Sequence, residues 1–92
     1  MRRDVYSLDF PTTISNGAAL RVADLTDKWL QVVGLTGTAN LEGTIDGATW
    51  VVLAALANGL AAVTAGVVSV RVARTGVGAG TAKLAGLARS SE

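Results

Sequence analysis

The carboxylates are the residues best suited to acid–base or metal chemistry, because the 92-residue chain has no histidine and no cysteine. Their absence excludes imidazole bases, thiol nucleophiles, disulfides and Cys/His zinc sites. An acid–base pair needs two carboxyl groups in unlike environments, usually in a cleft. Asp24 and Asp27 are instead expected in a turn, and Glu42 and Asp46 in a hairpin. No loop gathers enough oxygen ligands for calcium around Asp24, Asp27 or Asp46. We therefore expect no catalytic residue, metal site or cofactor, and no enzyme.

Two further patterns could suggest ligand binding. The glycine-rich stretch 76–80, GVGAG, lacks the lysine and the following amphipathic helix of a phosphate-binding loop, so we interpret it as a mobile hairpin loop. Arg71 and Arg74 lie three residues apart on an expected strand and therefore on opposite faces. With a net charge of only +1, the chain offers no basic patch, and we expect no nucleic-acid partner.

The composition favours a role in packing against other proteins. Half of the residues are hydrophobic, but most of these are Ala, Val and Leu, and aromatic residues make up only 4%. Charged residues make up 16%, against about 25% in average globular proteins. A chain of this length forms one small domain. Its missing charge must appear as apolar surface or as buried interface, and oligomer interfaces commonly absorb such surface.

The segment 47–70 has no charged residue and no proline, and its length is sufficient to cross a membrane. Three features favour buried strands instead. Asn58-Gly59 is typical of a tight turn, and the β-branched alternation after Val67 continues through Arg71. The flanks also lack clusters of basic and aromatic residues. We therefore expect no membrane association, and a small holin-like membrane protein is the lesser alternative.

The rest of the chain predicts an all-β fold, a single small β-sandwich or barrel of about six to eight short antiparallel strands. Turns are expected at 12–17 and 26–28, and strands at 18–25, 29–35, 41–45, 49–56, 67–74 and 81–87. In the later strands, alternation places Leu41, Gly43, Ile45, Val68, Val70, Val72, Ala82 and Leu84 on the inner face.

Residues 1–11 are expected to form an extended N-terminal arm or a first edge strand, and residues 12–92 the single β domain. Val5, Tyr6, Leu8 and Phe10 are spaced without a common face on which to be buried locally. We therefore predict that the arm makes contacts outside its own domain, by strand addition to a neighbour.

Residues 52–63 leave two interpretations open. Leu53, Leu56, Leu60 and Val63 recur at a helical spacing, and alanine favours helices. The opposite side is not charged, however, and Gly59 would interrupt a helix. Strand, turn and strand is the favoured interpretation.

Residues 44–50, TIDGATW, form the most specific local pattern. The Asp46-Gly47 pair between alternating residues predicts a hairpin tip, with Trp50 packed inward on the core. The segment resembles the Asp-box hairpin of sialidases, although it is one residue shorter between Asp46 and Thr49. That motif is chiefly architectural, so the resemblance implies no binding function.

A wider resemblance covers roughly residues 28–88. Val32-Val33-Gly34, the hairpin Leu41 to Trp50, and Val70-Arg71-Val72 before a glycine-rich loop are similar to the small β-rich structural proteins of tailed-phage virions, most of all head decoration (cement) proteins. The resemblance implies a non-enzymatic protein that stabilises the capsid lattice by binding between capsid subunits. It implies a homo-oligomer, with a trimer as the first expectation, and the major capsid protein or another virion protein as partner. The expected location is the capsid surface, after assembly in the host cytoplasm.

Two other classes of virion or binding protein fit the same residues. Tail, spike-base and fibre modules share the strand pattern. A small carbohydrate-binding module would need an exposed aromatic ring on a sheet face, which Trp29 or Trp50 would have to supply.

Overall fold

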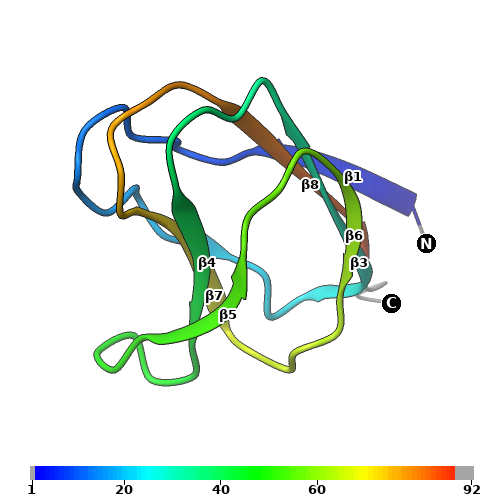
Figure 1. The fold of residues 1–92 in the computed structure, drawn as a ribbon. Coiled ribbons are helices and arrows are strands. Elements are labelled where there is room, and N and C mark those ends of the chain that lie inside the picture. Colours follow the sequence, from blue (N-terminus) through cyan, green and yellow to red (C-terminus); the bar gives the residue numbers. More distant parts are fainter. Residues whose placement is uncertain (1, 89–92) are drawn as a thin grey trace.

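The computed structural model describes residues 2–88, and these form eight strands and no helix (Figure 1). This confirms the predicted all-β fold of six to eight strands. The strands are β1 (Arg2–Ser7), β2 (Leu20–Arg21), β3 (Leu25–Val33), β4 (Ala39–Thr44), β5 (Val51–Ala55), β6 (Gly59–Val63), β7 (Ser69–Arg74) and β8 (Thr81–Ala88).

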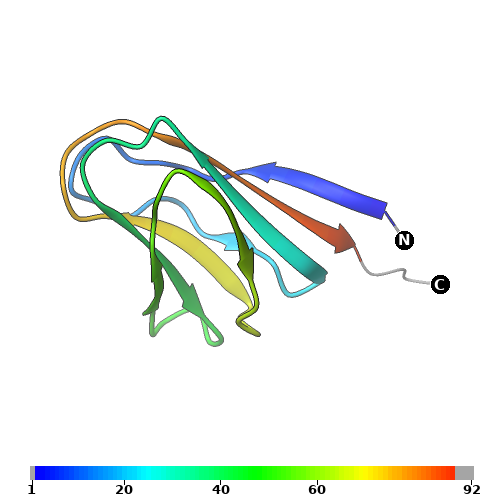
Figure 2. The same ribbon diagram turned by 45° about the vertical axis from the view of Figure 1, so that its right-hand side comes forward.

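The strands make two antiparallel sheets of four. The first sheet has the order β1-β8-β3-β6 and the second has the order β2-β7-β4-β5. The chain pairs as one long hairpin, in which β1 lies against β8, β2 against β7, β3 against β6 and β4 against β5. The hairpin is rolled up so that β3 also pairs with β8 and β4 also pairs with β7. This is the arrangement of a jelly roll, a double-sheet sandwich of eight strands. Figure 2 shows the two sheets as separate layers.

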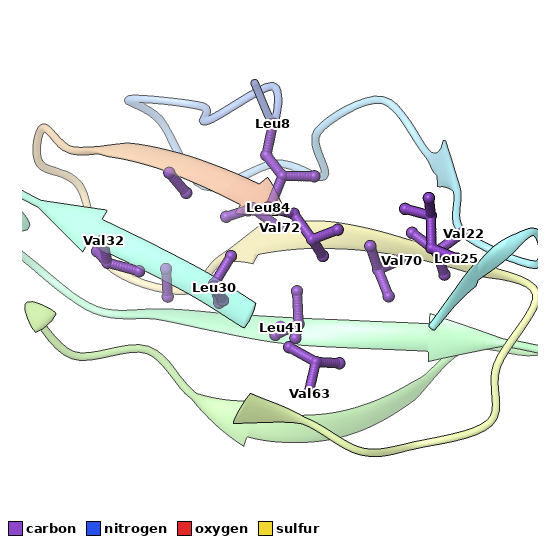
Figure 3. Packing of buried hydrophobic residues seen from close by; sticks show 12 residues of the cluster. Leu8, Val22, Leu25, Leu30, Val32, Leu41, Val63, Val70, Val72 and Leu84 are labelled. Carbon is purple, nitrogen blue, oxygen red and sulfur yellow. The ribbon is translucent and has the colours of Figure 1, made fainter. Parts of the chain in front are cut away.

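The core lies between the two sheets and is built from alternate residues of the longer strands (Figure 3). Val70 and Val72 of β7 and Leu84 of β8 have no exposed surface, and Leu41 and Ala82 are almost fully buried. The alternation in β7 and β8 therefore predicts the inward face correctly. Two-residue periodicity is a reliable signal here because each of these strands has one face on the core.

The polar triplet 26–28 is not a turn, which corrects the expected boundary. Strand β3 begins at Leu25 and continues through the triplet, while the pairing with β8 shifts register between Thr26 and Trp29. Asp27 has a φ of 51° within this β-bulge. An Asp in the left-handed region is typical of turns, and the same backbone geometry serves a bulge. Conversely, the expected strand 18–25 is reduced to Leu20–Arg21.

Residues 52–63 form strand, turn and strand, as favoured, and not a helix. However, Asn58-Gly59 does not close a hairpin, because β5 and β6 belong to different sheets. The short connection crosses from the second sheet to the first (Figure 1). Asn58 instead accepts a hydrogen bond on Oδ1 from the backbone N–H of Leu35, at 2.8 Å. Its side chain thus ties this crossing to the end of β3.

The glycine-rich stretch 76–80 is also a crossing between sheets, since it joins β7 to β8, and it is not a hairpin loop. It packs against the β3–β4 connection. The N–H of Thr36 donates to the carbonyl of Ala79 at 3.0 Å, and the N–H of Ala79 donates to Oγ1 of Thr36 at 2.8 Å. A Cβ on Gly78 would collide with the carbonyl of Thr36. The glycines therefore permit close contact between two backbone segments.

The N-terminal residues form an edge strand of the domain itself. Strand β1 pairs with β8 along its whole length, from Arg2 opposite Ala88 to Ser7 opposite Lys83. Leu8 is buried in the core, and Tyr6 and Phe10 pack against it. The premise that these apolar side chains lack a local face is therefore wrong for Tyr6, Leu8 and Phe10, whereas Val5 is exposed. Of the two interpretations of this segment, arm or edge strand, β1 forms the edge strand.

The Asp46-Gly47 pair lies in the loop of the predicted β4–β5 hairpin, which is longer than a two-residue turn. Strand β4 ends at Thr44, so Ile45 is exposed and does not continue the inner face. Trp50 is half-buried and does not belong to the core cluster, which corrects its expected inward position. Gly47 has a φ of 79°, a conformation that favours glycine.

Candidate functional site

Several carboxylates among the described residues accept hydrogen bonds from backbone N–H groups or from arginines. Oδ1 of Asp46 accepts hydrogen bonds from the N–H groups of Ala48 and Thr49, both at 2.8 Å, and from the hydroxyl of Thr44 at 3.0 Å. These donors, the N–H of Thr49 first, hold the pKa of Asp46 below its usual value. Asp46 therefore closes the hairpin loop, the architectural role that its resemblance implied.

Asp27 organises a polar group on the first sheet. Its Oδ2 accepts a hydrogen bond from Nη2 of Arg3 at 3.0 Å, and its Oδ1 accepts one from the indole N–H of Trp29 at 3.3 Å. The hydrogen bond from Arg3, followed by that from Trp29, lowers the pKa of Asp27. Asp24 lies in the β2–β3 turn and Asp27 in the β-bulge of β3. Within residues 2–88, no three carboxylates come together to hold a metal ion.

Trp29 is the exposed aromatic ring on a sheet face. It is 42% exposed, and the register places Ala62 of β6 and Ala85 of β8 on either side of it. These small neighbours leave the ring accessible from above. Its indole N–H is held by Asp27, so the ring has a defined orientation. An exposed, oriented ring of this kind can stack on a flat apolar surface.

The two arginines of β7 face opposite sides, as predicted. Arg71 lies on the outer face, where it contacts Trp50 and Glu42. Arg74 is only 2% exposed. Its guanidinium donates to three backbone carbonyls, those of Pro11 at 2.9 Å, Thr36 at 2.6 Å and Ala79 at 2.8 Å. Arg74 thus joins three loops at one end of the sandwich and is not available to a nucleic acid.

The two edge strands β5 and β6 contain no charged residue and are mostly exposed. Val52 on β5 is 57% exposed and Leu60 on β6 is 71% exposed. A hollow of about 170 Å³ lies between these strands and reaches core residues Leu30, Val32 and Leu41. The sequence signal for this surface is the uncharged stretch 47–70, which we interpreted only as buried strands. Among residues 2–88, no helix is long and apolar enough to cross a membrane.

Among residues 2–88, nine large hydrophobic side chains are exposed, and they occur on both sheets and in the connecting loops. They are Val5, Ile14, Trp29, Val33, Ile45, Val51, Val52, Leu60 and Val77.

No protein-family model, curated protein or solved structure matches this chain.

Proposed function

We propose that this chain is a non-enzymatic structural protein of a tailed-phage virion, most closely a head decoration protein. In this role, copies bind between subunits of the major capsid protein and stabilise the lattice. The protein acts as an oligomer on the capsid surface, after assembly in the host cytoplasm. A tail, spike-base or fibre module is the nearest variant of the same proposal.

The observation that carries the proposal is the distribution of exposed apolar side chains. Only 16% of the residues in the chain are charged, and in the part of it that the structure describes nine large hydrophobic side chains are exposed on both sheets and in the loops. Isolated exposed hydrophobics are ordinary, but this number on a domain of this size fits a subunit that contacts neighbours on several sides. The jelly-roll topology supports the same proposal by analogy, because viral capsid domains use it, although lectin domains do so as well.

The mechanism is interfacial. Each copy adds buried contact area between adjacent capsid subunits, so separating the subunits requires exposure of that area to water. The sandwich supplies a stiff platform, because its core is closed by buried side chains of both sheets and its loops are fixed by Arg74.

The test is removal of the gene from the phage genome that encodes it. Particles lacking the protein are expected to rupture at a lower temperature or at lower osmotic stress than wild-type particles. Purified protein added back should co-sediment with these particles in a fixed stoichiometry and restore their stability. Wild-type particles that contain no copies of the protein would contradict the proposal. A major capsid gene beside this one would support it.

A carbohydrate-binding module is the second candidate, and Trp29 is the observation that favours it. Stacking of a sugar ring on an oriented indole, with Asp27 beside it, is a common mode of carbohydrate recognition. Titration with oligosaccharides should then change the tryptophan fluorescence, and Trp29→Ala should abolish the change. An unchanged spectrum across neutral and charged oligosaccharides removes this candidate.

A further inference from the structure

The outer face of the first sheet continues from Trp29 into a polar hollow. On the two central strands of this sheet, β3 and β8, Gln31 lies directly opposite Lys83, and Val33 directly opposite Thr81. These four residues are exposed and line an open hollow of about 210 Å³. Side chains on one face of a strand repeat about every 7 Å, so the hollow begins one step along β3 from Trp29. One elongated ligand lying along β3 can therefore contact both the ring and the hollow.

The two ends of this face differ in charge. At the Trp29 end, Asp27 accepts the indole N–H and is also paired with Arg3 at 3.0 Å, so the charges of Asp27 and Arg3 offset each other. At the other end, the side chains of Lys83 and Gln31 have no polar partner among residues 2–88. The ammonium of Lys83 is thus available to an anion, and the amide of Gln31 can both donate and accept hydrogen bonds.

We propose that this face binds an oligosaccharide that contains both neutral and acidic sugar units. A neutral unit stacks its apolar C–H face on Trp29, whose orientation is fixed by Asp27. A unit with a carboxylate occupies the hollow, where it accepts a charge-assisted hydrogen bond from Lys83. Gln31 serves the hydroxyl groups between them.

The charge pattern selects this ligand over other anions and over neutral sugars. A nucleic acid, or a saccharide with a charge on every unit, would place an anion beside Trp29, where Asp27 and Arg3 offer no net positive charge. A wholly neutral saccharide would leave the ammonium of Lys83 without an anion.

A protein partner fits the face less well than a saccharide does. Lys83 and Gln31 lie on the central strands, so a protein that covered the sheet would bury the ammonium in the middle of the interface. Such burial is costly, and lysine is depleted from the cores of protein interfaces. A saccharide in an open hollow leaves the ammonium in contact with water.

The inference deepens the carbohydrate-binding candidate, on which it rests, by naming the class of ligand and two further residues that bind it. It does not depend on the virion role. A decoration protein with this site would attach its particle to a polysaccharide that contains acidic sugars.

The first test compares three oligosaccharides of equal length. Hyaluronan alternates acidic and neutral units, oligogalacturonate is acidic at every unit, and chitin is neutral. The purified full chain carries Trp50→Phe, which leaves Trp29 as its single tryptophan. The fluorescence of Trp29 should change on titration with hyaluronan, with an affinity about 10-fold higher than for either of the other two.

The second test removes the charge from the hollow. Lys83→Met keeps an unbranched stem at an exposed position and should lower the affinity for hyaluronan about 10-fold, while the affinity for chitin stays unchanged. Arg21→Met is the matched control, because it removes one exposed positive charge from the other sheet, and it should bind hyaluronan as the wild type does. Trp29→Ala, measured by calorimetry, should weaken the binding of both sugars. The Tm of each variant checks its fold.

Three results would overturn the inference. Equal affinity for hyaluronan and chitin, or hyaluronan binding that Lys83→Met does not weaken, would remove the acidic ligand and leave the carbohydrate-binding candidate in place. Tightest binding of oligogalacturonate would remove the neutral unit on Trp29. Binding of none of the three sugars would remove both the inference and that candidate, whereas the virion role is decided separately by the particle experiment.

Discussion

Arg71 lies over the indole ring of Trp50, with its guanidinium carbon 4.2 Å from the ring centroid. The same guanidinium donates from Nε to Oε1 of Glu42 at 2.8 Å. The cation is therefore held between an aromatic face and a carboxylate. Because Val70 and Val72 on either side of Arg71 face the core, this contact lies on the outer surface of the second sheet. Trp50 thus anchors the β4–β5 hairpin from outside.

The position of Trp50 sets the expected cost of removing its ring. A half-buried ring that contributes a cation–π contact should be worth less than a core aromatic, so Trp50→Ala should lower the free energy of unfolding by about 1–2 kcal/mol. Leu84→Ala, at a fully buried position, should cost about 2–5 kcal/mol. Urea denaturation of both variants gives the comparison.

The contact itself is measured by a double-mutant cycle of Trp50→Ala with Arg71→Met, which keeps an unbranched stem at position 71. A coupling of about 0.5–2 kcal/mol is expected. A coupling near zero would mean that the two side chains lie together without stabilising the hairpin.

Arg74 should be the most sensitive charged residue. Arg74→Met removes the donors for the carbonyls of Pro11, Thr36 and Ala79 and leaves these oxygens without the guanidinium. The expected loss is about 3–5 kcal/mol, a large part of the stability of a small domain. Arg21→Met in the exposed part of β2 is the control and should change stability by less than about 0.5 kcal/mol. Equal effects of the two substitutions, measured by urea denaturation, would contradict the proposed role of Arg74.

The lowered pKa values of Asp27 and Asp46 predict acid destabilisation. A lowered pKa in the folded state means that folding favours the ionised carboxyl. The stability it adds is complete above the usual aspartate pKa and is lost as the pH falls through the lowered value. The Tm should therefore be level between about pH 7 and pH 5 and should fall below about pH 4.

A pair of substitutions at Asp46 separates its charge from its hydrogen bonds. Asp46→Asn keeps an oxygen that can accept from Ala48 and Thr49 but does not titrate, so the fall in Tm below pH 4 should be smaller. Asp46→Ala removes the acceptor and should lower the Tm at every pH. A fall in Tm that is unchanged in Asp46→Asn would show that other groups cause it.

Deletion of residues 2–10 should destabilise the domain instead of only weakening assembly. The deletion removes strand β1 from the edge of the first sheet and Leu8 from the core. We expect a large fall in Tm or loss of the folded state by circular dichroism. A deletion variant that melts like the wild type would show that β1 is dispensable.

Contacts of the N-terminal strand outside the domain need a milder change. Val5 is exposed, so Val5→Asp leaves the core intact while altering the outer surface of β1. A normal Tm together with reduced incorporation into particles would identify β1 as an assembly element. Normal incorporation would place the capsid contact elsewhere.

The sequence alone determined the features that depend on neighbours along the chain. The alternation in β7 and β8 identifies Val70, Val72 and Leu84 as core residues, because a strand with one face on the core repeats every two residues. The Asp46-Gly47 pair identifies the β4–β5 hairpin, because its loop is closed by hydrogen bonds within three residues of Asp46. The lack of charge from 47 to 70 marks the segment that forms the uncharged edge strands β5 and β6.

The tertiary structure alone decided which strands share a sheet and where the few polar side chains lie. Asn58-Gly59 has the composition of a hairpin turn, yet it lies at the end of a crossing between sheets. The reason is that β5 pairs with β4 in one sheet and β6 pairs with β3 in the other. The burial of Arg74 depends on the carbonyls of Pro11 and Thr36, which are 63 and 38 residues away along the chain. No local pattern encodes these partners, since they meet only when the rolled hairpin brings its distant segments together.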